Sequence, residues 1–189
     1  MDNIQLNELI ALSPLLKHKF SGCFASNTFP ALRADDTFQL INSAPFGEFG
    51  EHWLLLVRVK EEEETNEELD GMMLIFYDSS GRPLKSSFPN VYERFLSLYS
   101  PTKCNYHINN NANAIAPNVI VKQLFPSQSL TQPSQTTICG LYCIFVAHYI
   151  FGGRGGTLCN VPLYATTEDV LRFVSDNYGI NFSRYNIFL

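Results

Sequence analysis

The sequence predicts an α+β fold in which a central mixed β-sheet is flanked by helices. Two strongly apolar runs, residues 52–59 and 71–78, indicate neighbouring strands of this sheet. Helical patterns come before and after these strands without alternating strictly with them. With 189 residues and an apolar fraction of 46%, the chain can form a full hydrophobic core, and we expect one domain over residues 1–189.

The N-terminal part of the chain predicts a helix followed by two short strands. Apolar residues recur at helical spacing in the first twelve positions, which indicates a short amphipathic helix. The face of this helix that meets the core is expected to carry Leu6, Leu9 and Ile10. Ser13-Pro14 has the form of a helix N-cap and first helical position, so a second short helical piece is expected there. Residues 20–24 and 37–41 then indicate strands.

Residues 52–59 and 71–78 predict a β-hairpin. Both runs are apolar at almost every position and not only at every second one, which indicates strands covered on both faces. Residues 61–70 between them carry seven acidic side chains, which we interpret as a solvated hairpin tip that resists edge aggregation. In an antiparallel hairpin the start of the first strand lies opposite the end of the second. His52 and Asp78 are therefore expected side by side.

Three further helices and one strand complete the prediction. Residues 89–99 and 139–151 predict helices, and the second is apolar on every side and therefore buried. Residues 118–125 between them predict a third buried strand. A final helix over about 168–177 is expected to begin with a capping box and to stop at Gly179.

Charge and cysteine content argue against several classes of protein. The net charge is −5 and the basic residues are scattered, which argues against strong non-specific DNA binding. No apolar run is long enough to span a bilayer, and the N-terminus lacks a basic region ahead of an apolar core, so neither a membrane span nor a secretory signal is expected. In the reducing compartment that this implies, five cysteines without CxxC spacing predict neither a disulfide framework nor a zinc site.

One cysteine lies where a reactive thiolate can be stabilised. Cys139 stands at the junction between a polar loop and the buried helix, and Gly140 follows it. The free N–H groups and the dipole at a helix N-terminus favour negative charge, so they lower a thiol pKa from about 8.5 toward neutrality. From this stretch alone, a core cysteine without chemistry is an equal alternative.

A nucleophilic cysteine needs a base within reach and a group that orients the base. His148 lies nine positions along the same helix, roughly 13 Å from Cys139 along the axis, and is out of reach. His52 opens a buried strand after a glycine-bearing loop and, together with Trp53, is the best candidate for the base. Asp78 is then the candidate for the orienting acid.

The sequence leaves open other roles for Asp78 and other candidates for the orienting acid. Asp78 also suits the start of a turn with the Ser-Ser-Gly sequence that follows it, and both roles can hold together. Glu48 and Glu51 are sequence neighbours of His52, but their loop places them less firmly.

Hydrolysis also needs donors for the oxyanion. Gln132 lies seven positions before Cys139, in a loop that must fold back over the start of the helix. Its amide can donate beside the N–H of Cys139. Gln128 and Gln135 are rivals that the sequence does not separate from Gln132.

Together these residues resemble the adenovirus-type endopeptidase (adenain) family, within the wider group of cysteine proteases that includes the SUMO-processing enzymes. The motifs that carry the resemblance are His52-Trp53, Phe76-Tyr77-Asp78, and Gln132 seven positions before Cys139-Gly140-Leu141. The similarity covers roughly residues 5–180. It implies a papain-like or adenain-like cysteine protease fold. In that fold Cys139 is the nucleophile, His52 the base, Asp78 the orienting acid and Gln132 an oxyanion donor.

The resemblance implies a cysteine endopeptidase that cleaves viral or virus-like structural precursor proteins after small residues such as glycine. Its source would be a virus or a virus-like transposon, and its place the host nucleus, the cytoplasm or the virion. Two alternatives from the same clan are a protease for ubiquitin-like proteins and an acetyltransferase with the same triad. A catalytically inactive binding module is a third, and the intact set of motif residues argues against it.

The chain departs from the adenoviral pattern in three respects. Twenty-six positions separate His52 from Asp78, more than in the adenoviral enzymes, because of the acidic segment. The acid is Asp, as in the SUMO-processing branch, where adenoviral enzymes commonly use Glu. Adenoviral enzymes are basic and are stimulated by DNA and by a short peptide, whereas this chain is acidic, which argues against DNA activation. Cys104 falls near the place of the peptide-linking cysteine but in surroundings that do not align, so no cofactor is expected to be required and a peptide activator is left open.

Overall fold

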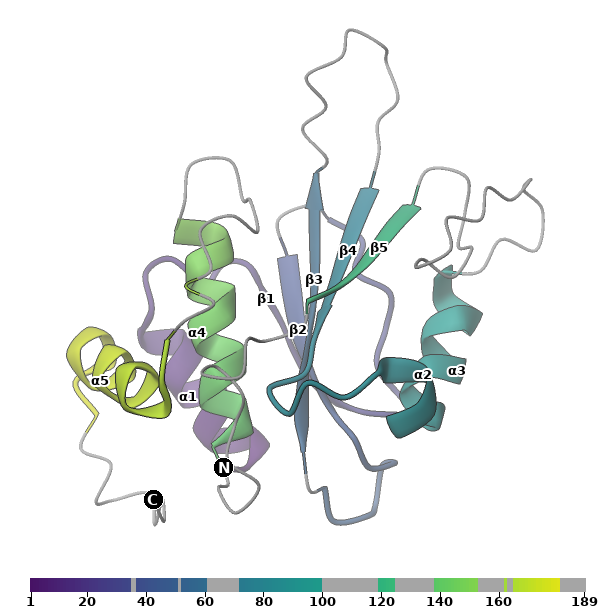
Figure 1. Ribbon diagram of the computed structural model, residues 1–189, viewed down its shortest axis with the longest axis horizontal. Helices are drawn as coiled ribbons and strands as arrows, with labels where there is room; N and C mark the ends of the chain where they lie inside the picture. The colour runs from purple at the N-terminus through teal and green to yellow at the C-terminus, as the bar shows by residue number, and fades with distance from the viewer. Residues whose placement is uncertain are drawn as a thin grey trace, which may run out of the picture.

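A computed structural model of the chain describes residues 1–34, 37–50, 52–60, 72–99, 119–124, 138–152, 162 and 165–180. The described part contains a five-stranded mixed sheet with helices on both faces, which confirms the predicted α+β class (Figure 1). The strands are β1 (Phe20–Ala25), β2 (Thr37–Asn42), β3 (Trp53–Lys60), β4 (Met72–Tyr77) and β5 (Val119–Leu124). The helices are α1 (Asn3–Leu12), α2 (Leu84–Ser87), α3 (Pro89–Tyr99), α4 (Cys139–Gly152) and α5 (Thr167–Tyr178). No helix in these ranges is long and apolar enough to cross a membrane.

The strands lie in the order β1-β2-β3-β4-β5. The three central strands are antiparallel, whereas β1 and β5 run parallel to their neighbours at the two edges. The predicted hairpin is therefore confirmed as β3 and β4, with Leu55 opposite Tyr77 at the end that leads to the site. This register brings the residue before β3 and the residue after β4 to the same end of the sheet.

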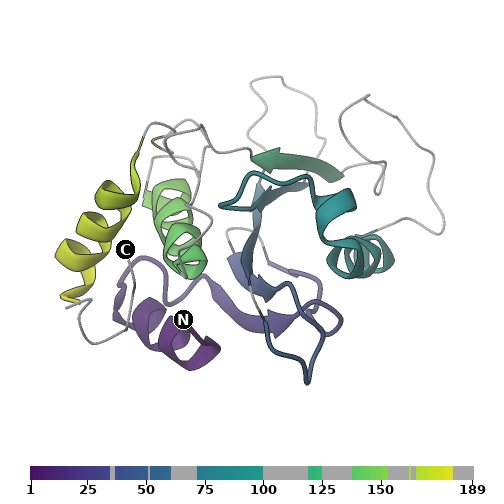
Figure 2. The same ribbon diagram turned by 60° about the horizontal axis from the view of Figure 1, so that its bottom comes forward.

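Alternate side chains of β3 and β4 enter two separate cores, which confirms that both faces of the hairpin are covered. On one face lie α1, α4 and α5, and on the other lie α2 and α3 (Figures 1 and 2). Leu55, Val57, Ile75 and Tyr77 enter the first core. Leu54, Leu56, Leu74 and Phe76 enter the second. The helix that begins with Cys139 thus packs on the same face of the sheet as α1.

Helix α4 is buried along most of its length, as its uniformly apolar sequence predicts. Gly140 lets α1 approach its first turn, because a Cβ at this position would lie 2.5 Å from Cδ2 of Leu6. Helix α5 begins with the predicted capping box between Thr166 and Asp169. It ends at Gly179, whose φ of 64° is the left-handed conformation that glycine adopts most readily.

Two expectations about local structure differ from the observed fold, and one observed helix was not expected. The segment after Ser13 forms turns and no helix, although the Ser13 hydroxyl accepts the N–H of Leu16 (3.1 Å) as an N-cap would. The chain has only six further residues before it enters β1. Strand β5 is not fully buried, since it is an edge strand and Lys122 points to solvent. Helix α2 was not predicted, because four residues carry too little periodicity. The acidic segment 61–70 lies outside the described residues.

Candidate active site

The end of the β-hairpin brings His52 and Asp78 into contact. His52 comes directly before β3 and Asp78 directly after β4. Nε2 of His52 lies 2.5 Å from Oδ1 of Asp78, which is a short hydrogen bond between a base and an acid. Both residues are buried, with 9% and 2% of their surfaces exposed. Antiparallel pairing, the basis on which the two side chains were expected to be neighbours, accounts for this contact.

Asp78 is also held by the turn that it begins. The N–H of Ser80 donates to Oδ1 (3.0 Å), and the N–H of Arg82 donates to Oδ2 (2.9 Å). The hydroxyl of Ser80 lies 2.6 Å from Oδ2. The turn-initiating role and the His52-orienting position are therefore both present in one side chain.

Cys139 is the first residue of α4 and is 4% exposed. The backbone N–H of Trp53 donates to its Sγ at 3.3 Å. His52 also interacts with Cys139, strongly enough that each group shifts the pKa of the other. Because Nε2 is engaged by Asp78, Nδ1 is the ring nitrogen available to the sulfur. Asp78, His52 and Cys139 therefore interact in series.

These contacts move the pKa values of all three groups. Burial raises the pKa of the Cys139 thiol, but the hydrogen bond and charge of His52 and the N–H of Trp53 outweigh it, so this pKa lies below its ordinary value. Burial lowers the pKa of His52, but the hydrogen bonds to Asp78 and Cys139 reverse this and raise the pKa to about 9. Burial raises the pKa of Asp78, but the hydrogen bonds from His52 and Ser80 lower it to about 2. These shifts all favour transfer of the thiol proton to the imidazole, which gives a thiolate and an imidazolium beside the Asp78 carboxylate.

Iodoacetamide labelling should reveal this ion pair. A free thiol gains reactivity only as pH approaches its pKa of about 8.5. Cys139 is expected to be labelled well below that pH, and its rate should change again near pH 9, where His52 loses its proton. The difference in labelling between wild type and Cys139→Ala isolates this one sulfur. A single rise near pH 8.5 would contradict the ion pair.

The other described cysteines and His148 lie in settings without such chemistry. Burial raises the pKa of Cys143 well above its usual value, and its Sγ donates to the carbonyl of Trp53 at 3.5 Å. Burial likewise raises the pKa of Cys23 to about 12. His148 packs its ring edge-on to Phe173, and burial lowers its pKa. Cys139 therefore differs from both of its described counterparts.

Several residues that the sequence predicts at the site are not among those that the structure describes. Those outside the described residues are Gln132, Gln128, Gln135, Glu51 and Cys104. The oxyanion donor and the peptide-linking position therefore stay predictions. Glu48 is described and is exposed in the loop before β3, while His52 contacts Asp78. Within the described ranges no three His, Cys, Asp or Glu side chains are grouped to hold a metal ion.

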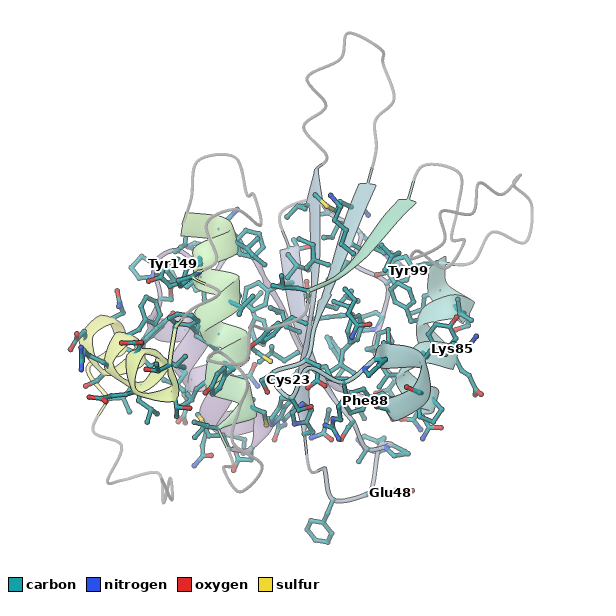
Figure 3. All side chains as sticks on the ribbon, in the orientation of Figure 1. Cys23, Glu48, Lys85, Phe88, Tyr99 and Tyr149 are labelled. Carbon is teal, nitrogen blue, oxygen red and sulfur yellow. The ribbon has the colours of Figure 1, made fainter. Side chains whose placement is uncertain are left out.

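A groove of about 620 Å³ adjoins the site. Its walls come from the first residues of the chain, the end of β1, the 44–50 loop and Trp53, whose N–H contacts Cys139. Phe46 is 80% exposed and Phe49 fully so, while Cys23 lies at the sheet and Glu48 at the far end of the loop (Figure 3). This groove was not predicted from the sequence. The available signal was a pair of aromatic residues in a turn-rich loop directly before His52.

Among known proteins, the chain has a distant structural likeness to a solved protease. No family model matches the sequence, and no curated protein matches it. Among solved structures, the chain is similar to the crystal structure of the ASFV pS273R protease, at 15% identity and a TM-score of 0.49. The match covers 95% of this chain and 67% of that one. So remote a likeness carries no inference about chemistry, which rests on the side chains described above.

Proposed function

We propose that this protein is a cysteine endopeptidase with Cys139 as the nucleophile, His52 as the general base and acid, and Asp78 as the orienting group. The observation that carries the proposal is the hydrogen bond from His52 to Asp78, together with a thiol at a helix N-terminus whose pKa is lowered by His52. The sequence resemblance to adenain-type proteases, which rests on the order and spacing of the same residues, also supports it. The proposal includes a single protease domain over residues 1–189 with an adenain-like fold.

In this mechanism the thiolate of Cys139 attacks the carbonyl carbon of a peptide bond, and a C–S bond forms as the carbonyl becomes an oxyanion. The N–H of Cys139 and the predicted amide of Gln132 would donate to that oxyanion. The His52 imidazolium then gives its proton to the departing amine as the C–N bond breaks. Neutral His52 next takes a proton from water, which attacks the acyl-enzyme and releases the acid and the thiolate. Asp78 keeps Nε2 engaged, so that Nδ1 faces the sulfur at each step.

The substrates that we propose are viral or virus-like structural precursor proteins cleaved after small residues such as glycine. The cleavage preference and the location in an infected cell or virion come from the family resemblance. The groove beside Trp53 is wide and aromatic, so it suits larger apolar side chains that flank the small residue. The chain's acidic charge argues against activation by DNA, and no cofactor is expected to be required.

Removing aromatic side chains from the groove should weaken substrate binding. Phe46→Ala and Phe49→Ala are each expected to lower kcat/KM by about 5- to 30-fold, mainly through KM, because each change removes apolar contact area. The measurement is steady-state cleavage of a fluorogenic peptide with an apolar residue near the glycine. Leu12→Ala is the matched control, since Leu12 is 60% exposed on α1 and does not line the groove. An equal loss in Leu12→Ala would contradict the role of the groove.

A direct assay separates the proposal from its alternatives. The protein is incubated with glycine-containing precursor peptides, with fusions to ubiquitin-like proteins, and with acetyl-CoA plus an acceptor peptide. Cleavage of the precursor peptides, lost in Cys139→Ala, is the expected result. Turnover with acetyl-CoA alone would replace the proposal by a transferase. Cleavage of the fusions alone would indicate a protease for ubiquitin-like proteins.

A further inference from the structure

We propose that Arg82 and Phe88 clamp the His52–Asp78 pair and set the plane of the imidazole ring. Both are positioning residues, because they act on the sulfur only through His52 and Asp78. The inference rests on the proposed cysteine protease function and adds a requirement to it. A contact between Asp78 and His52 alone leaves the ring free to tilt about that contact.

The proposed mechanism requires the His52 imidazole to interact with two groups at once. Nε2 contacts Asp78, and the proposed mechanism needs Nδ1 to act on Cys139, so both the direction and the tilt of the ring matter. The side-chain torsion that sets this tilt has only broad, weak preferences of its own. Some neighbouring group therefore has to define the plane.

Phe88 lies where it can define this plane. It connects α2 to α3 and is 6% exposed, on the side of α2 that faces the sheet (Figure 3). Its ring stacks on the His52 ring, with centroids 5.8 Å apart and planes only 7° from parallel. Rotation of the imidazole out of its plane would bring it into collision with this flat surface.

Arg82 contacts both Phe88 and the turn that holds Asp78. Its guanidinium carbon lies 4.5 Å from the centroid of the Phe88 ring, which is cation–π distance. Its Nε lies 2.5 Å from the Ser80 hydroxyl and 3.5 Å from Oδ2 of Asp78. One side chain thus holds both the ring that stacks on the base and the hydroxyl that holds the acid.

The backbone of the turn makes these links possible. Gly81 has a φ of 70°, and its N–H donates to the carbonyl of Asp78 at 3.0 Å. This left-handed residue returns the chain so that the Arg82 N–H also reaches the Asp78 carboxylate. The five residues 78–82 therefore form one hydrogen-bonded turn that orients the Asp78 carboxylate. The Arg82 side chain connects this turn to Phe88.

The test compares Phe88→Leu, Phe88→Tyr and Arg82→Lys with wild type. Phe88→Leu keeps apolar bulk but removes the flat face, so kcat should fall about 10- to 100-fold while KM changes less than twofold. Phe88→Tyr keeps the ring and should restore most of kcat. Arg82→Lys keeps the charge but loses the planar group and its Nε, so it should resemble Phe88→Leu more closely than Phe88→Tyr.

Tyr92→Leu is the matched control, because Tyr92 is a partly buried aromatic residue on α3. Its ring pairs with Lys85, whose Nζ lies 5.8 Å from the ring centroid, whereas the Phe88 ring stacks on His52. Equal losses in Tyr92→Leu and Phe88→Leu, or a loss that only follows the folded fraction in a thermal melt, would overturn the clamp.

Iodoacetamide labelling of Cys139 gives a readout that does not require proteolysis. The titratable groups that act on His52 are Asp78 and Cys139, and both remain in Phe88→Leu. If the clamp holds, iodoacetamide labels Cys139 more slowly at pH 6–8 in Phe88→Leu than in wild type or Phe88→Tyr. An unchanged labelling profile together with an unchanged kcat would overturn the clamp. A wild-type protein that shows the profile but cleaves no peptide would overturn the protease function and leave the clamp standing.

Discussion

Replacing Cys139 with alanine is expected to lower kcat for peptide cleavage by about 10⁴-fold or more. The sulfur is the one atom that forms the covalent bond in the proposed mechanism, and no described neighbour can take its place. Cys143, the next cysteine on the helix, is fully buried and its pKa is raised well above the usual value. The measurement is single-turnover cleavage of a glycine-containing precursor peptide, with intact-mass detection of the acyl-enzyme in wild type.

Cys143→Ala is the control for this result. It removes a thiol of the same size from the same helix and should retain most of kcat, although its melting temperature should fall slightly. Cys139→Ala should keep the fold, since it removes a single sulfur atom and alanine suits a helical position. Cleavage that survives in Cys139→Ala, or that disappears equally in Cys143→Ala, would refute the assignment of the nucleophile.

Replacing Asp78 with asparagine is expected to lower kcat by about 10³- to 10⁴-fold. The hydrogen bond from His52 to the carboxylate helps to raise the pKa of His52 to about 9. Loss of the negative charge lowers that pKa, so the imidazolium survives over a narrower range. In the pH–rate profile the alkaline limb should move to lower pH. In wild type this limb should lie near pH 9, and the acidic limb should follow protonation of the thiolate.

Stability gives a second measure of the same substitution. The pKa of Asp78 is about 2 in the folded protein and near 3.8 without its partners, so its contribution to stability is full above pH 3.8. This contribution is lost as pH falls through about 2. Asp78→Asn should therefore reduce the free energy of unfolding at neutral pH and flatten its acid dependence. Asp176→Asn, which changes an exposed acid on α5, is the control that should leave kcat unchanged. An unshifted alkaline limb in Asp78→Asn would show that the carboxylate does not act on His52.

Local pattern and strand pairing were enough to predict the centre of the site. The two apolar runs could pair only as a hairpin, and antiparallel pairing alone places His52 near Asp78. The change from polar loop to uniformly apolar helix placed Cys139 on a first turn. These inferences need only sequence neighbours or one strand pairing, which is why they could be made from the chain itself.

The parts that were missed depend on contacts between elements far apart in the sequence. Phe88 stacks on His52 only because α2 and α3 pack against the sheet, and no local pattern distinguishes it from an ordinary core aromatic. The groove forms where the N-terminus, β1 and the 44–50 loop meet. The burial of β5 was overestimated because sequence does not reveal that a strand has a neighbour on one side only.

Trp53 contacts α4 through both of its backbone polar groups. Its N–H contacts the Cys139 sulfur, and its carbonyl accepts from the Cys143 sulfur one turn further along. A helix joined at two successive turns to a single residue can neither slide nor rotate without breaking one of these bonds. His52 is the residue directly before Trp53, so the base and the nucleophile take their positions from the same short piece of strand. We therefore expect a displacement of this piece of strand to carry the base and the nucleophile together.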